Sequence, residues 1–167
     1  MERLWAPWRM EYIKKCDEFP GCIFCVLPAQ DKDRENLILH RGKTCFIMLN
    51  TFPYNTGHLM IAPFKHTADM YALSDEELLE ISRTVRFAVK LLAETMQPDG
   101  FNLGVNLGRT AGAGVADHVH WHIVPRWNGD TNFMPVIADT KVLPESLLAT
   151  YDKLKEKIAE LGVDSGV

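Results

Sequence analysis

His118-Val119-His120-Trp121-His122-Ile123-Val124-Pro125 is the stretch of this sequence that decides the fold. Histidines and apolar residues alternate along it, and a period of two is typical of a β-strand. Such a strand places the three imidazoles on one face and Val119, Trp121 and Ile123 on the other. We therefore expect the apolar face to anchor the strand to a core, while the opposite face presents histidines as nucleophiles, acid–base groups or metal ligands.

The spacing within this strand argues against a single metal ion bound by all three histidines. Successive residues on one face of a strand lie roughly 6.5–7 Å apart, so the backbones of His118 and His122 are expected to lie about 13 Å apart. A zinc–nitrogen bond is about 2 Å long, so one ion cannot easily bind both residues. The three imidazoles must therefore have different roles.

The sequence around the histidines predicts an α+β domain with a mainly antiparallel sheet. A capping box of Ser74 and Glu77 begins a long helix whose apolar residues recur at helical spacing to about Met96. A C-terminal helix ends at Gly162. Further strands are expected over residues 37–40, 44–49, 58–62 and 101–107. We expect one domain over residues 1–167, with an N-terminal aromatic arm that contains Trp5, Trp8 and Tyr12.

Composition and charge restrict the class of protein. The chain has 167 residues and a formal net charge of −4, so we expect no basic nucleic-acid-binding surface. The longest apolar runs are far shorter than a membrane span, and the N-terminus lacks the pattern of a signal peptide. Four cysteines without an export signal indicate reduced thiols or metal ligands rather than disulfides. A cytoplasmic location is the expectation.

Cys22 and Cys25, separated by two residues, form half of a tetrahedral zinc site. The sequence has no second pair of this kind, so histidines would have to complete the site, and His66 and His118 are the candidates. The alternative is a turn with two buried thiols, in which His66 is an ordinary surface histidine. A thioredoxin-like redox pair is not favoured, because no matching strand–helix context follows.

The remaining two histidines follow a glycine-rich loop over residues 108–114. A neutral imidazole can attack phosphorus and form a covalent intermediate, provided that its other nitrogen donates to an acceptor that fixes the tautomer. Glycines let the backbone approach a ligand, and successive N–H groups can form an anion-binding concavity. Next to His120 and His122, the loop is therefore interpreted as a phosphate cradle, although glycines at this spacing also form ordinary surface turns.

The segment from His118 to Val124 resembles the His-φ-His-φ-His-φ-φ signature of the histidine triad (HIT) family of nucleotidyl hydrolases and transferases. The similarity covers most of the chain, since Asn50, residues 57–63, the long helix and residues 106–125 occur in the family's order. It implies the HIT-like fold, with a five-stranded mainly antiparallel sheet, one long central helix and a C-terminal helix. It also implies a homodimer in which the sheet continues across the interface.

The resemblance implies roles for individual residues. His120 would be the nucleophile that attacks the α-phosphorus and carries the nucleotidyl group, and His122 would contact the phosphate beside it. Asn50 matches the residue that binds the ribose hydroxyls. Asn106, Gly112 and Gly114 would complete the nucleotide-binding site. In zinc-bearing members a structural zinc ion is bound by the first triad histidine, a Cys-x-x-Cys pair and the histidine of a Pro-φ-Lys-His segment. For this chain, the resemblance implies the ligands Cys22, Cys25, His66 and His118.

Residues 125–133 and 4–12 resemble the bacterial diadenosine tetraphosphate phosphorylase-like branch of the family. This implies cleavage of a dinucleoside polyphosphate, with phosphate as the acceptor of the nucleotidyl group. Many phosphoramidate-cleaving members carry Gln and Ser where this chain has Gly114 and Val115, so two side-chain donors to the phosphate and leaving group are missing. Alternatives are hydrolysis with water as acceptor, zinc hydrolysis at an open metal site, and a non-catalytic nucleotide-binding or sensor protein.

Overall fold

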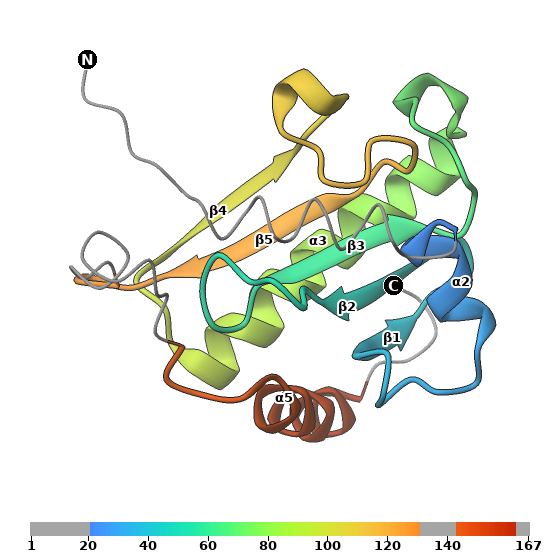
Figure 1. Cartoon of the computed structure of the whole chain (residues 1–167). Helices are drawn as coiled ribbons and strands as arrows, with labels where there is room; N and C mark the ends of the chain where they lie inside the picture. Colours follow the sequence, from blue (N-terminus) through green and yellow to red (C-terminus); the bar gives the residue numbers. More distant parts are fainter. Residues whose placement is uncertain (1–20, 131–142, 163–167) are drawn as a thin grey trace, which may run out of the picture.

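A computed structural model describes residues 21–130 and 143–162, which contain a five-stranded antiparallel sheet surrounded by helices (Figure 1). The strands, in their order across the sheet, are β1 (Ile38–Arg41), β2 (Cys45–Leu49), β3 (Leu59–Pro63), β5 (Trp121–Arg126) and β4 (Gly100–Val105). The helices are α2 (Ile23–Ala29), α3 (Asp75–Met96) and α5 (Leu147–Leu161), and two 3₁₀ turns cover Met70–Ala72 and Arg109–Ala111. The predicted α+β class and five-stranded sheet are confirmed.

Helix α3 has the boundaries that the sequence predicts. The Ser74 hydroxyl accepts a hydrogen bond from the Glu77 backbone N–H at 3.2 Å, and the Glu77 carboxylate accepts one from the Ser74 N–H at 2.7 Å. A capping box of this kind satisfies two N–H groups that the first turn of a helix leaves without partners. The helix ends at Met96, and the next residue, Gln97, adopts a left-handed conformation with φ of +50°. Its apolar stripe packs on one face of the sheet and forms the main core with the inward residues of β2, β3 and β5.

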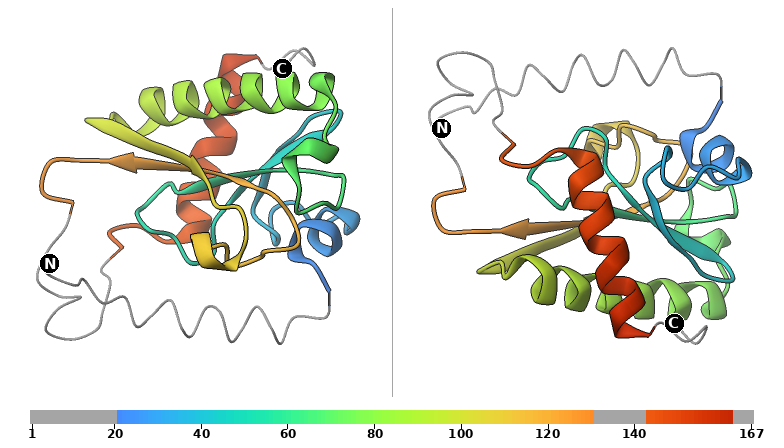
Figure 2. Two further views of the ribbon diagram at one scale, coloured as in Figure 1. Left: turned by 90° about the horizontal axis from the view of Figure 1, so that it is seen from above. Right: turned by 90° about the horizontal axis from the view of Figure 1, so that it is seen from below.

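Helix α5 crosses α3 on the same side of the molecule and covers strand β1 (Figure 2). Two of its side chains donate hydrogen bonds to backbone carbonyls of β1: the Tyr151 hydroxyl to Ile38 at 3.1 Å, and the Lys155 ammonium to Leu39 at 3.0 Å. Strand β1 is one edge of the sheet and β4 is the other. The two edges therefore differ, because side chains of α5 occupy carbonyls of β1.

Helix α2 covers the opposite face of the sheet and was not predicted from the sequence. It begins after Cys22 and contains Pro28 near its end, in a segment of only seven residues. Its one fully buried side chain, Phe24, packs on a second core formed by Ile38, Phe46, Met48, Met60 and Ala62. Strands β2 and β3 are buried along their whole length because helices lie on both faces.

The histidine strand is shorter than predicted, because β5 begins at Trp121 rather than at His118. Before it, the Val119 N–H donates to the carbonyl of Thr67 at 2.7 Å instead of to a neighbouring strand of the sheet. The apolar face is as expected, since Val119 and Ile123 lie in the main core and Trp121 packs against it. The strand assignment was therefore wrong for His118 and His120. The division into two faces holds, because both of these rings pack against Phe24 of the second core, whereas Val119 lies in the main core.

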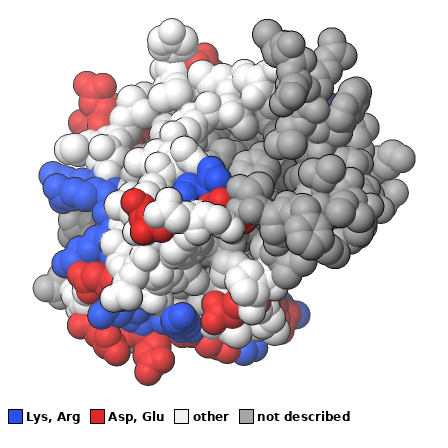
Figure 3. Space-filling model, turned by 90° about the vertical axis from the view of Figure 1, so that its left-hand side faces the viewer, with Lys and Arg blue, Asp and Glu red and all other residues white. Residues whose placement is uncertain are grey.

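On the face shown in Figure 3, positive and negative side chains are interspersed rather than gathered by sign. Within the described residues, none of the helices combines the length and the hydropathy of a transmembrane segment. The aromatic arm with Trp5, Trp8 and Tyr12, and residues 131–133 of the branch motif, lie outside the described part of the chain.

Candidate active site

The first cluster of functional side chains joins the start of α2 to the histidine segment. The Sγ atom of Cys22 lies 3.3 Å from Nδ1 of His118, and Sγ of Cys25 lies 3.3 Å from Nδ1 of His66. The two Nδ1 atoms are 3.3 Å apart, and Cys25 Sγ is 3.6 Å from Nδ1 of His118. All four ligand atoms lie within 4.8 Å of one another. The structure thus brings together the four residues that the resemblance assigned to a metal.

The four separations of 3.3–3.6 Å fit a tetrahedral ion, and no two of the ligand atoms are more than 4.8 Å apart. With metal–nitrogen and metal–sulfur bonds of about 2.0–2.3 Å, the ligand atoms of a tetrahedral site lie about 3.3–3.8 Å apart. The Nε2–H of His118 donates to the carbonyl of Pro63 at 2.8 Å, which leaves the lone pair on Nδ1, the atom that faces the other three ligands. Such a bond from the second ring nitrogen is the usual way in which a protein orients a histidine ligand. The four residues could therefore hold a metal ion.

Burial has opposite effects on these ligands, because it favours the neutral imidazole that binds a cation and disfavours the thiolate that binds it. Burial lowers the pKa of His118 to about 4, against the opposing effect of its bond to Pro63, so this imidazole is neutral at pH 7. Burial raises the pKa of the Cys22 thiol to about 11. A divalent cation reverses the second effect, because it stabilises the thiolate that coordinates it.

His120 lies beside this cluster and presents a neutral ring with a fixed tautomer. Its Nδ1–H donates to the carbonyl of His118 at 2.8 Å, so the lone pair is on Nε2. Burial lowers the pKa of the imidazole, and the bond to His118 opposes that shift. The Phe24 ring lies 4.6 Å from the His120 ring and the His122 ring lies 4.8 Å from it, measured between centroids. This is the state that nucleophilic attack by histidine requires.

His122 receives its orientation from His58. The Nδ1 atom of His58 faces two donors, the Tyr54 backbone N–H at 3.1 Å and the Asn50 side-chain amide at 3.4 Å. The proton of neutral His58 must then lie on Nε2, which donates to Nδ1 of His122 at 3.0 Å. His122 therefore carries its own proton on Nε2. Nε2 of His120 therefore carries a lone pair, whereas Nε2 of His122 carries a proton.

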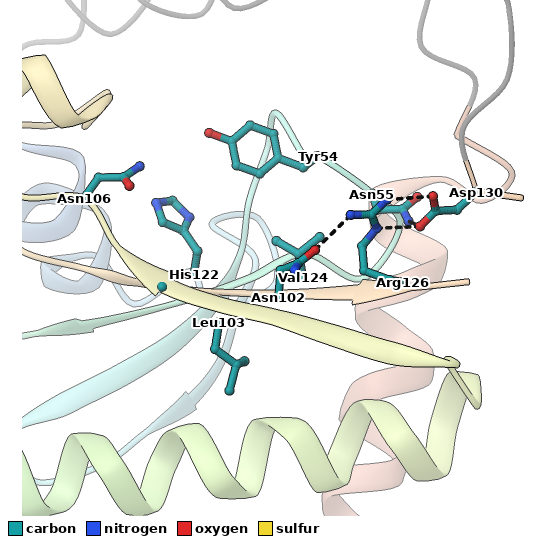
Figure 4. A pocket seen from close by; sticks show the side chains of 10 residues that line it. Tyr54, Asn55, Asn102, Leu103, Asn106, His122, Val124, Arg126 and Asp130 are labelled. Carbon is teal, nitrogen blue, oxygen red and sulfur yellow. Dashed lines mark hydrogen bonds and ion pairs between the residues drawn. The ribbon is translucent and has the colours of Figure 1, made fainter. Parts of the chain in front are cut away.

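A cavity of about 370 Å³ extends from His122 along strands β4 and β5 (Figure 4). Tyr54 and Asn106 lie near His122 at one end, and the side chains at the other end form a hydrogen-bonded group. The other residues that line the cavity are Asn55, Asn102, Leu103, Gly104, Val124, Arg126 and Asp130. His120 does not line this cavity; it lies against His122 and is only 2% exposed.

The residues predicted to bind the nucleotide are not all in one place. Asn106 lines the cavity with His122 and donates weakly to the carbonyl of Gly112 at 3.5 Å. Gly112 follows the 3₁₀ turn in a left-handed conformation with φ of +92°. Gly114 instead lines a separate cavity of about 320 Å³ beside Cys22 and His66. The amide oxygen of Asn50 accepts the Phe52 N–H at 2.9 Å, so this side chain braces the loop after β2 as well as His58.

His58 is not among the residues that the sequence assigned to the site, and its contact with His122 was missed. His58 is fully buried and directly precedes β3, whose residues pair with β5 so that Leu59 faces Ile123 and Met60 faces His122. Only the register between these two strands reveals the contact. The available signal was that Asn50 and a histidine flank the turn between β2 and β3, where two polar side chains next to buried strands need partners.

Residues 31–129 match the family model described as the HIT domain. The chain is 38% identical over 158 residues to the AP-4-A phosphorylase of Mycobacterium tuberculosis H37Rv, covering 90% of this chain and 80% of that protein. It is 31% identical over 138 residues to an adenosine 5′-monophosphoramidase of Schizosaccharomyces pombe, covering 83% and 98%. A Zn-bound histidine triad family protein from Mycobacterium smegmatis has the same fold, with a TM-score of 0.67 at 22% identity over 84% of this chain and 95% of that one.

Proposed function

The chain belongs to the HIT domain family, and on that premise we propose that it cleaves a dinucleoside polyphosphate, such as diadenosine tetraphosphate, through a nucleotidyl–histidine intermediate on His120. The observation that carries this proposal is the pair of opposite tautomers, with a lone pair on Nε2 of His120 beside a proton on Nε2 of His122. The similarity to the AP-4-A phosphorylase supports phosphate as the acceptor.

The reaction proceeds in two displacements. Nε2 of His120 attacks the α-phosphorus, a P–N bond forms, and the bond to the bridging oxygen breaks, so that ATP leaves when the substrate is diadenosine tetraphosphate. His122 donates its Nε2–H to a phosphate oxygen as negative charge redistributes in the transition state. An oxygen of inorganic phosphate then attacks the same phosphorus, the P–N bond breaks, and ADP is released with His120 restored to its neutral state.

Asn50 would bind the ribose hydroxyls, and Asn106, Gly112 and Gly114 would contact the nucleotide. The side chain of Asn50 already bonds to His58, so ribose binding and the orientation of His122 depend on the same amide. Asn106 borders the cavity beside His122, which supports its assignment to the phosphate end of the nucleotide. These assignments place the nucleoside of the transferred group on the side of β2.

We assign a structural zinc ion to Cys22, Cys25, His66 and His118. The two-sulfur, two-nitrogen donor set and its tetrahedral spacing support zinc over ions that prefer oxygen ligands. The ion would fix the start of α2 against the histidine segment. A site with four protein ligands has no open position for a substrate or water, so this zinc would act on stability rather than on the reaction.

The alternatives differ in the acceptor or in the absence of chemistry. The similarity to an adenosine 5′-monophosphoramidase favours, as the second candidate, a hydrolase that passes the nucleotidyl group to water. A nucleotide-binding sensor would use the same cavity without turnover.

We further propose that residues 1–167 form a single cytoplasmic domain without nucleic-acid or membrane partners.

Product analysis tests the reaction directly. Diadenosine tetraphosphate incubated with the protein and inorganic phosphate is expected to yield ADP and ATP, and phosphate labelled with ³²P should appear in ADP. Release of AMP and ATP without a requirement for phosphate would identify the hydrolase. Tight binding with no product under either condition would overturn the proposed function in favour of the sensor.

The β4 edge is the proposed dimer interface. Among the strands of residues 21–130 and 143–162, β4 pairs only with β5, and its Leu103 is 54% exposed. An open edge strand can pair with a second copy and so continue the sheet. Leu103→Lys is expected to convert a dimer to a monomer in sedimentation or light-scattering measurements, because it places a charge at the apolar edge. Leu148→Lys, which changes a similarly exposed leucine on α5, is the matched control and should leave the mass unchanged.

A further inference from the structure

The cavity beside His122 continues as a groove whose floor consists of two strands. Strand register pairs Gly104 with His122, Asn102 with Val124 and Gly100 with Arg126. Since alternate residues of a strand share a face, these residues of β4 and β5 lie side by side. A Cβ atom built on Gly100 or on Gly104 meets no atom within 4 Å. Gly104, which lines the cavity, therefore leaves open space beside the imidazole, and Gly100 leaves open space beside the guanidinium at the other end.

Charge is balanced at the guanidinium end of this groove. Arg126 donates to both carboxylate oxygens of Asp130, at 2.6 and 2.9 Å, and to the amide oxygen of Asn102 at 2.9 Å (Figure 4). Asn55 also donates to Asp130, at 2.9 Å. The Asp130 carboxylate neutralises the guanidinium, so this end suits an uncharged polar group better than a polyphosphate, which needs uncompensated positive charge.

The same end retains hydrogen-bond donors and a planar surface. Arginine has five N–H groups, and the bonds to Asp130 and Asn102 use three of them. The Arg126 side chain is 46% exposed, and the side-chain nitrogen of Asn102 adds further donors. A guanidinium plane can stack on an aromatic ring, while such N–H groups pair with the ring nitrogens or carbonyl oxygens of purines. A nucleobase combines these properties.

We propose that this groove binds the second nucleoside of a dinucleoside polyphosphate, the one that departs with the leaving group. The proposal rests on the proposed function, because it requires the reacting phosphorus to lie near His120 and His122. His122 and Arg126 are four residues apart on one strand, or about 13 Å between backbones. The bridging phosphates would cross the open space at Gly104, and the base would reach Asn102 and Arg126.

Two substrates that differ only in this nucleoside test the proposal. Diadenosine tetraphosphate carries the second adenosine, whereas adenosine 5′-tetraphosphate lacks it. Asn102→Ala removes donors from the groove, and Gly100→Val fills the space beside Arg126. Each is expected to lower kcat/KM about tenfold for diadenosine tetraphosphate, as for the loss of one or two hydrogen bonds or of a base contact. Neither should change kcat/KM for adenosine 5′-tetraphosphate.

Asn128→Ala is the matched control, because Asn128 is an exposed amide that does not line the groove. This variant should leave kcat/KM unchanged for both substrates. Equal losses for both substrates, or no loss for either, would overturn the proposal. A higher KM for inorganic phosphate alone would mean that the groove binds the acceptor, which also overturns it.

A binding measurement separates this inference from the proposed reaction. If the unmodified protein cleaves neither substrate, the proposed function fails, but the groove is still tested by calorimetry. Diadenosine tetraphosphate should then bind more tightly than adenosine 5′-tetraphosphate. Asn102→Ala should lower the ratio of the two affinities about tenfold. Equal affinities of the unmodified protein for the two nucleotides would overturn the assignment of the groove.

Discussion

Replacing His120 with alanine is expected to lower turnover of diadenosine tetraphosphate by roughly 10⁴- to 10⁶-fold, the range seen when a covalent nucleophile is removed. The reason is geometric, since the bond from Nδ1 to the carbonyl of His118 keeps a lone pair on Nε2, and alanine has no nitrogen that can attack phosphorus. Steady-state rates measure the loss. Alkaline quenching with labelled substrate, under which an N–P bond persists, should detect a labelled protein only when His120 is present.

The control for this experiment is a histidine outside the site. His40 is half-buried on β1 and packs near Phe87, with 6.1 Å between ring centroids. His40→Ala should retain the rate and the labelled intermediate. The His120→Ala protein should unfold cooperatively, with a free energy of unfolding lower by about 1–3 kcal/mol, because a buried ring is lost. Substantial turnover in a folded His120→Ala protein would contradict the covalent role.

Removing the metal with a chelator is expected to lower the unfolding temperature by about 10 °C. A ligand present at 1,000 times its dissociation constant stabilises the folded state by about 4 kcal/mol, and in a chain of this size each kcal/mol shifts Tm by about 2–4 °C. Unfolding temperatures with and without chelator, together with the zinc content of the purified protein, check the result.

A ligand variant makes the metal experiment specific. Cys25→Ala should have the Tm of the chelated protein, and a chelator should not lower it further. Activity should then fall only as the protein unfolds, since the four-ligand site has no open position. If a chelator stops turnover without changing Tm, the metal takes part in the reaction and the structural assignment is wrong.

Local patterns in the sequence predicted the elements that local interactions determine. The capping box and apolar periodicity defined α3 to the residue at its start, and the cluster of Cys22, Cys25, His66 and His118 followed from spacing and family resemblance. The capping box and the Cys22–Cys25 pair are visible in short stretches of sequence, whereas His66 and His118 were assigned through the resemblance. Capping is satisfied within one turn, and a Cys-x-x-Cys pair keeps its two thiols close in almost any turn.

The features that were missed depend on tertiary contacts. Helix α2 is only seven residues long and contains a proline, so packing of Phe24 on the sheet, rather than helix propensity, accounts for it. The late start of β5 has a similar cause, because Val119 bonds to the loop at Thr67. His58 could be connected to His122 only through the register of β3 against β5, which no local pattern specifies.

The difference between the two sheet edges limits how far copies of this chain can assemble. A pair joined through β4 would present only its two β1 strands at the outer edges, where Tyr151 and Lys155 already occupy the carbonyls of Ile38 and Leu39. An edge blocked in this way is a poor template for another strand. Growth of the sheet into a fibre would therefore stop at two copies, and the C-terminal helix would then protect the protein against aggregation as well as covering its core.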